Sequence, residues 1–166
     1  MSVITDKKAF EKAIPILATD AKRLPKLLAA LAPAERRWAE ANGFDGAPNS
    51  VCVIADAKGN VAKVLAGVVD ASDPWALASL PQKLPRGRYA LGKGAVTIAP
   101  HDAAFAWDLG SYQFARYKRA RRKPADLQVD GGTRVRESLE VSQAVRLVRD
   151  LVNTPSEDME IGRAHV

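Results

Sequence analysis

The stretch Ser50-Val-Cys-Val-Ile-Ala55, followed by Asp56-Ala-Lys-Gly-Asn60 and the run from Val61 to Val69, decides the fold. β-Branched residues fill both runs, and turn-forming residues separate them, so the segment predicts an antiparallel hairpin. Cys52 lies inside the first strand. We expect it to be a buried thiol rather than a nucleophile, because no cation stands near it in the sequence.

Helices with proline at their start precede the hairpin. Pro25 to Leu31 and Pro33 to Ala41 predict two helical pieces, because proline is harmless where a helix begins. Thr5 to Ala13 predicts a short amphipathic segment with Thr5 as its cap. Ile14 to Leu17 predicts an edge strand, because Pro15 lacks the N–H that an inner strand would use.

The chain after the hairpin alternates helices and strands. The helices are expected from Asp73 to Leu80, from Ala103 to about Arg121, and after Thr133 as far as Asn153-Thr154-Pro155. Strands are expected at 87–91, 95–99 and 126–129. Gly110 weakens the second helix and indicates a close approach or a break. Interleaved elements of this kind predict an α/β fold with a mixed sheet flanked by helices.

Apolar residues recur along one face of the last of these helices. Its stripe is made of Val141, Ala144, Val145, Val148, Leu151 and Val152. Arg146, Arg149 and Asp150 lie largely off this stripe.

Composition excludes several classes of protein. The 166 residues are 47% hydrophobic and 27% charged, which is ordinary for one globular domain. One cysteine and two histidines cannot form a disulfide or a four-ligand zinc set of the usual kind. We find no apolar stretch of membrane-spanning length and no signal peptide, so we expect a cytoplasmic protein without a membrane partner.

The excess of positive over negative charge lies in one cluster. Six basic residues between Arg116 and Lys123 account for the whole net charge of +6; they are Arg116, Lys118, Arg119, Arg121, Arg122 and Lys123. One hypothesis is a stand-alone nucleic-acid-binding module, in which the cluster contacts phosphates and Tyr112, Phe114 and Tyr117 stack on bases. The favoured interpretation is a solvated helix end closed by Pro124, so a nucleic-acid partner is not expected.

No catalytic, metal-binding or cofactor-binding residue can be assigned from the residues alone. Gly92-Lys93-Gly94 lacks the third glycine and the helix start of a dinucleotide loop. His101 beside Asp102 has no nucleophile that can be named with it, and neighbours in sequence seldom face each other as a base and its orienter. Glu157 and Asp158 stand in a polar tail without a scaffold for metal binding.

Two stretches resemble one enzyme family. The sequence Ala-Val-Arg-Leu-Val-Arg-Asp-Leu-Val-Asn-Thr-Pro-Ser-Glu-Asp-Met, from Ala144 to Met159, is similar to the helix and turn at which M17 leucyl (cytosol) aminopeptidases enter their catalytic domain. Asp108 to Lys118 resembles their Leu-Gly-Ser-Tyr-Arg-Phe-x-Arg-Tyr-Lys segment and departs from it at Gln113. The resemblance covers about residues 1 to 159.

The resemblance implies a metal-dependent exopeptidase that removes N-terminal residues from peptides and assembles as a hexamer. In the family, two divalent ions (Mn or Zn) are held by a C-terminal catalytic domain, whose Asn-Thr-Asp-Ala-Glu-Gly-Arg motif does not occur here. The expected organisation is therefore a macro-domain-like α/β N-terminal domain (1–132), a linking helix with the start of the catalytic domain (133–159), and a non-native tail (160–166) that includes His165. We expect this fragment to be inactive and to meet peptide substrates only through the missing domain. A nucleotide or ADP-ribose pocket would rest on fold analogy alone.

Overall fold

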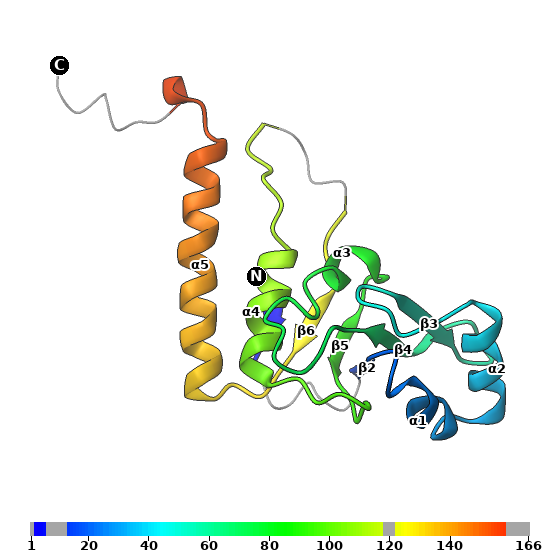
Figure 1. The fold of residues 1–166 in the computed structure, drawn as a ribbon. Coiled ribbons are helices and arrows are strands. Elements are labelled where there is room, and N and C mark those ends of the chain that lie inside the picture. The colour runs from blue at the N-terminus through cyan, green and yellow to red at the C-terminus, as the bar shows by residue number, and fades with distance from the viewer. Residues whose placement is uncertain (1, 6–12, 118–121, 159–166) are drawn as a thin grey trace, which may run out of the picture.

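A six-stranded mixed sheet with helices on both faces forms the molecule (Figure 1). The computed structural model describes residues 2–5, 13–117 and 122–158. The strands, in the order β1-β6-β5-β2-β4-β3, are β1 (Val3–Ile4), β6 (Asp126–Gln128), β5 (Arg88–Leu91), β2 (Ile14–Thr19), β4 (Val61–Gly67) and β3 (Val51–Ala55). All neighbouring pairs run parallel except β3 with β4. The predicted mixed α/β fold is confirmed.

The described residues form five α-helices beside the sheet: α1 (Leu24–Ala29), α2 (Pro33–Ala41), α3 (Leu80–Lys83), α4 (Pro100–Gly110) and α5 (Thr133–Asn153), followed by a short 3-10 helix, Ser156–Asp158. Both α1 and α2 carry a proline in their first two positions, as predicted. Within the described parts of the chain, none of these helices combines the length and apolarity needed to cross a bilayer.

The hairpin of β3 and β4 is formed as predicted, with Cys52 opposite Leu65. Its turn is closed by Asp56, whose carboxylate accepts hydrogen bonds from the backbone N–H groups of Lys58 and Asn60, both at 2.8 Å. Gly59 adopts a positive φ of 82°, which suits glycine.

Side chains of β4 alternate between two cores because successive residues of a strand point to opposite faces. Val64 and Ala66 pack into the large core shared with α4, which contains Trp107 and Tyr89. Leu65 packs into the smaller core under α1 and α2, together with Cys52. The sheet is thus covered on both faces.

The strand β2 is not at the edge of the sheet as predicted but lies between β5 and β4. Pairing with β4 begins only at Ile16. Pro15 therefore precedes that ladder, and its missing N–H costs no bond to β4.

Three other predictions on element boundaries are wrong. Residues 95–99 form no strand, because Val96 donates one isolated backbone hydrogen bond to Ala18 and the loop then turns into α4. Residues 74–79 are turns, and the helix starts only at Leu80. The long helix ends at Gly110 rather than near Arg121. The expected segment from Thr5 to Ala13 lies mostly outside the described residues.

Gly110 ends α4 because another segment approaches it closely. A Cβ atom at this position would lie 1.8 Å from the carbonyl oxygen of Ala78. The side chain of Gln82 donates to the carbonyl oxygen of Gly110 at 3.0 Å. Both interpretations of Gly110, a close approach and a break, are confirmed.

Candidate docking surface on the last helix

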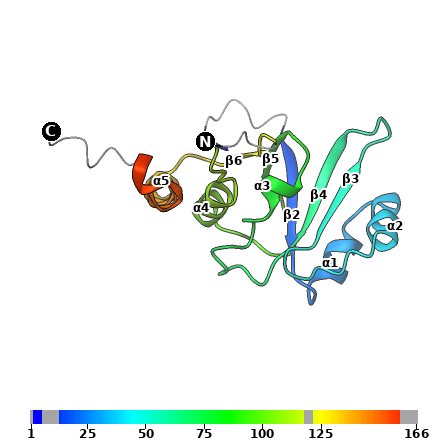
Figure 2. The same ribbon diagram turned by 90° about the horizontal axis from the view of Figure 1, so that it is seen from above.

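The last helix, α5, lies along α4 at the outside of the molecule, beyond the sheet (Figures 1 and 2). Its first turns pack by apolar contact, with Val135 and Leu139 buried in the large core. Further along, the face toward α4 is polar, because Ser142, Arg146 and Arg149 follow at spacings of four and three residues.

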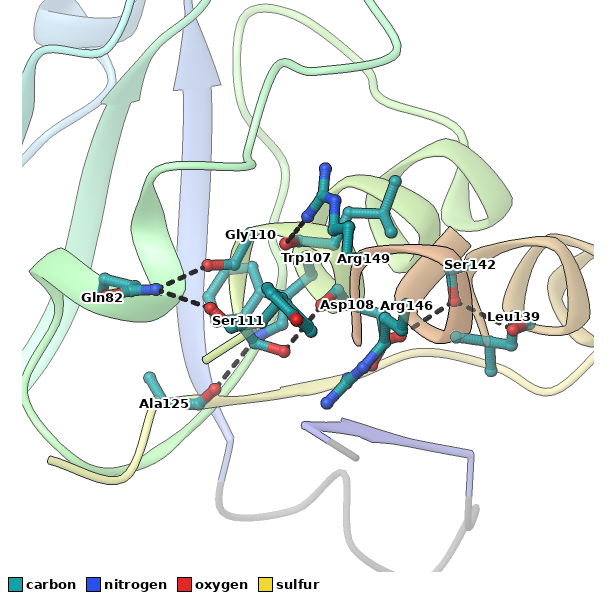
Figure 3. A network of polar contacts seen from close by, with 12 residues as sticks. Gln82, Trp107, Asp108, Gly110, Ser111, Ala125, Leu139, Ser142, Arg146 and Arg149 are labelled. Atoms are coloured by element: carbon teal, nitrogen blue, oxygen red, sulfur yellow. Dashed lines mark hydrogen bonds and ion pairs between the residues drawn. The ribbon is translucent and has the colours of Figure 1, made fainter. Parts of the chain in front are cut away.

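A buried carboxylate joins the two helices (Figure 3). Asp108 of α4 is fully buried and accepts a hydrogen bond at 2.9 Å from the guanidinium of Arg146. Its other oxygen accepts from the hydroxyl of Ser142, also at 2.9 Å. We refer to Asp108, Ser142 and Arg146 as the Asp108 network. A buried charge needs such partners, so the network fixes the register of α5 on α4.

Tyr112, just after α4, extends this contact toward the end of α5. The guanidinium groups of Arg146 and Arg149 lie 5.9 and 5.5 Å from the centre of its ring. Its hydroxyl donates to Asp150 at 2.7 Å. The pKa of Tyr112 is raised, mainly by desolvation and to a smaller extent by this hydrogen bond.

The turn after α5 is held by the end of α5 and by the loop after α4. Thr154 is buried and its hydroxyl donates to the carbonyl oxygen of Asp150 at 2.7 Å. Tyr117 donates to the carboxylate of Asp158, and this hydrogen bond raises the pKa of the phenol. The 108–118 and 144–159 stretches quoted for their resemblance to one family therefore contact each other.

The opposite face of α5 is apolar and exposed. Most of the predicted stripe turns away from α4, since on a helix of 3.6 residues per turn its positions lie on the other side from Ser142 and Arg146. Val145 is half-buried, and Leu147, which the prediction left out, is exposed as well. The exposed fractions are 55% for Val141, 59% for Leu147, 58% for Val148, 42% for Leu151 and 79% for Val152. An exposed apolar face of this kind is a candidate docking surface.

The other candidate residues do not assemble into a site. Cys52 is buried, as expected, and burial raises the pKa of its thiol. His101 lies in the first turn of α4, as expected, with its Nε2 3.6 Å from a carboxylate oxygen of Asp102, which is beyond hydrogen-bond distance. Among the described residues, no three His, Cys, Asp or Glu side chains gather as metal ligands would. His165 lies outside the described residues.

Gly92-Lys93-Gly94 follows β5 and packs against β2. A Cβ at Gly94 would lie 2.4 Å from the carbonyl oxygen of Ala18, so these glycines serve the close approach of the loop to the strand. A cavity of about 370 Å³ lies beside them, lined by Lys93, Thr97 and mostly apolar residues. No observation identifies a nucleotide there, and the ADP-ribose hypothesis stays a prediction.

The basic cluster contacts the rest of the chain where it is described. Arg116 donates to the carbonyl oxygen of Asp158 at 3.2 Å and Arg122 to that of Leu84. Lys123 lies 3.7 Å from Asp126. Lys118, Arg119 and Arg121 lie outside the described residues. The cluster does not continue a helix, because α4 has already ended at Gly110.

Comparisons with known proteins agree with this geometry. The profile of the M17 aminopeptidase N-terminal domain matches residues 14–130. The cytosol aminopeptidase of Coxiella burnetii is 31% identical, with a TM-score of 0.83 over 95% of this chain and 34% of that one. A tomato leucine aminopeptidase mutant is 16% identical (TM-score 0.63, covering 93% of this chain and 38% of that one). The bottromycin maturation enzyme BotP in complex with Mn is 22% identical (TM-score 0.59, covering 87% and 32%). The search of curated proteins found no match.

The fold and the matched segment are those of the N-terminal domain of M17 aminopeptidases. The chain belongs to the M17 aminopeptidase family. It spans about a third of the length of the solved relatives. The domain boundary predicted at residue 132 stays a prediction; the profile ends at 130 and α5 begins at Thr133.

Proposed function

We propose that this chain serves as the N-terminal domain of a leucyl-aminopeptidase-type exopeptidase that releases N-terminal amino acids from peptides in the cytoplasm. Membership of the M17 family supports the reaction class, and the likeness to a cytosol aminopeptidase supports the compartment. In this proposal the peptide is bound and cleaved by polypeptide corresponding to the remaining two thirds of the relatives.

The two divalent metal ions of the family, Mn²⁺ or Zn²⁺, belong to that remaining part. The described residues do not fit a metal pair, since no three potential ligands gather among them. The complex of BotP with Mn supports manganese. On this proposal the 166-residue chain alone hydrolyses no peptide.

The observation that carries the proposal is the apolar face of α5. It points away from the chain's own sheet, and it runs up to Asn153-Thr154-Pro155, where the resemblance places the entry into the catalytic domain. We propose that the catalytic domain covers this face, and that the whole enzyme forms a homo-hexamer.

A chimera tests the proposal. Residues 1–153 of this chain replace the matched segment of the Coxiella burnetii enzyme, and hydrolysis of leucine-p-nitroanilide with added Mn²⁺ is measured. We expect activity in the chimera and a large loss with Val148→Lys. Gln143→Lys adds the same charge to another exposed position of α5 and is expected to retain activity. Metal-dependent turnover by the 166-residue chain alone would show that the assignment of the site is wrong.

A further inference from the structure

A hollow lies between the first half of α4 and the first turns of α5. Its volume is about 400 Å³. Phe105 and Val141 form its apolar part, and the other residues that line it have polar or ionisable side chains. These are His101, Arg134, Glu137 and Ser138.

The turn region after β4 places a large aromatic side chain beside this hollow. The ring of Trp75 packs against the ring of Phe105, with 5.8 Å between the ring centres and an angle of 47° between the planes. The side chain of Trp75 is nevertheless 49% exposed. Tryptophan is highly buried on average, and it is enriched where one protein surface contacts another. The half-exposed aromatic pair therefore indicates a contact surface at the edge of the hollow.

One wall of the hollow continues into the apolar face of α5. Residues three or four positions apart lie along one ridge of a helix. The ridge that starts in the hollow contains Arg134, Ser138, Val141, Val145, Val148 and Val152. Its first three members line the hollow, and Val141, Val148 and Val152 belong to the exposed apolar face. A body that covers the end of this ridge therefore has the hollow directly beside it.

The part of the relatives that lies outside the matched region is large enough to reach the hollow. The chain covers 34% of the Coxiella burnetii enzyme, so about two thirds of that enzyme is further polypeptide. The helix rises about 16 Å between Val141 and Val152. A globular domain of about 300 residues is roughly 50 Å across. One domain attached at the end of α5 therefore spans both the apolar face and the hollow.

We propose that the catalytic domain, bound along α5 as in the proposed function on which this inference rests, also fills this hollow with an apolar side chain. That side chain packs on Phe105 and Val141 and covers Trp75. Arg134 and Glu137, one turn apart on α5 and of opposite charge, bind polar groups around it, as the polar rim of an interface does. Trp75 is thus a contact between the two domains, although it lies outside α5.

Acrylamide quenching of tryptophan fluorescence tests the proposal. It is measured on the 166-residue chain, diluted until it sediments as a monomer, and on the chimera with the Coxiella burnetii enzyme. The signal of Trp75 is the difference between each protein and its Trp75→Phe variant. We expect Trp75 to be quenched several-fold less in the chimera than in the chain. Trp38 of α2, which is 51% exposed, is measured in the same way with Trp38→Phe and should be quenched equally in both.

A substitution tests the same contact through stability. Trp75→Lys should shorten the half-life of the activity of the heated chimera, because it places a charge in the interface. Trp75→Phe keeps an aromatic ring there and should largely preserve this half-life. In the 166-residue chain, Trp75→Lys should change the midpoint of urea unfolding little, because the side chain is half exposed.

The possible results separate this inference from the proposed function. An active chimera in which Trp75 is quenched as readily as in the isolated chain would overturn the inference alone. Equal protection of Trp38 would do the same, because the change would not be specific to the hollow. Protection of Trp75 that is lost on dilution of the chimera would assign the hollow to a second copy of the protein. An inactive chimera would overturn the proposed function and this inference with it.

Discussion

Arg146 donates to the fully buried carboxylate of Asp108 at 2.9 Å, across 38 residues of sequence. Arg146 and Ser142 stand at positions of α5 that face α4, where apolar residues are usual between two packed helices. Beyond Leu139 the helix thus presents its polar side to its own domain and its apolar side outward. Removing one partner of this contact would leave a buried charge uncompensated, so the contact favours this orientation of the helix.

Arg146→Met should destabilise the chain by about 3 kcal/mol, because it leaves the charge of Asp108 buried with one partner fewer. Urea unfolding measures the change. Arg136→Met removes an exposed arginine from the same helix and should cost less than about 0.5 kcal/mol. Equal effects of the two substitutions would contradict the role of the Asp108 network.

Gly110→Ala should destabilise the chain by about 2–3 kcal/mol, because the new methyl group would collide with the backbone of Ala78. Gly132→Ser is the control. Nothing lies within 4 Å of a Cβ at this N-cap position of α5, and serine is a better cap, so stability should rise by a few tenths of a kcal/mol. Thermal unfolding of the two variants compares them, and a neutral Gly110→Ala would be inconsistent with the close approach.

The ion pair between Glu35 of α2 and Lys63 of β4 predicts an acid dependence. The hydrogen bond from Lys63 lowers the pKa of Glu35 below its ordinary value of 4.5. Because the folded pKa lies below the unfolded one, the pair stabilises the fold above about pH 4.5 and loses this contribution as the pH falls through the folded pKa. Glu35→Gln should make the free energy of unfolding less dependent on pH in that window, by about 1 kcal/mol or less for a partly exposed pair. Unchanged pH dependence in urea melts would refute the prediction.

The apolar face of α5 should make the isolated chain associate. Sedimentation at rising concentration and binding of a hydrophobic dye measure the effect, and Val148→Lys should reduce both without loss of stability because the side chain is exposed. Gln143→Lys should leave both unchanged. A monodisperse wild-type monomer that binds no dye would show that the face needs no cover.

Local patterns predicted the parts of the fold that depend on near neighbours. The β3–β4 hairpin follows from its turn residues, and the starts of α1 and α2 follow from their prolines. The central place of β2 could not be read in this way, because strand order depends on contacts between distant segments. Pro15 suggested an edge, yet its position before the β4 ladder removes the conflict.

The docking surface was predicted only in part. The apolar stripe of α5 was found from its spacing, but the partner of Arg146 was not, since Asp108 lies in another helix. A signal was present: Asp108 stands among Ala106, Trp107 and Leu109, all apolar, and an ionisable residue there needs a buried partner. The aromatic residues after Gly110 led to the wrong prediction that this helix continues to about Arg121. Tyr112 instead packs on the arginines of α5.

Because α5 is long, contacts near its C-terminal end constrain its direction more than contacts near its start do. Twenty-one residues at 1.5 Å each make a helix about 30 Å long, and two adjacent glycines, Gly131 and Gly132, precede it. A swing of about 10° at that end would displace Asn153 by roughly 5 Å on this geometry. Asp108 and Tyr112 contact the second half of α5, far from these glycines. Their contacts therefore determine where the last turn of the helix lies.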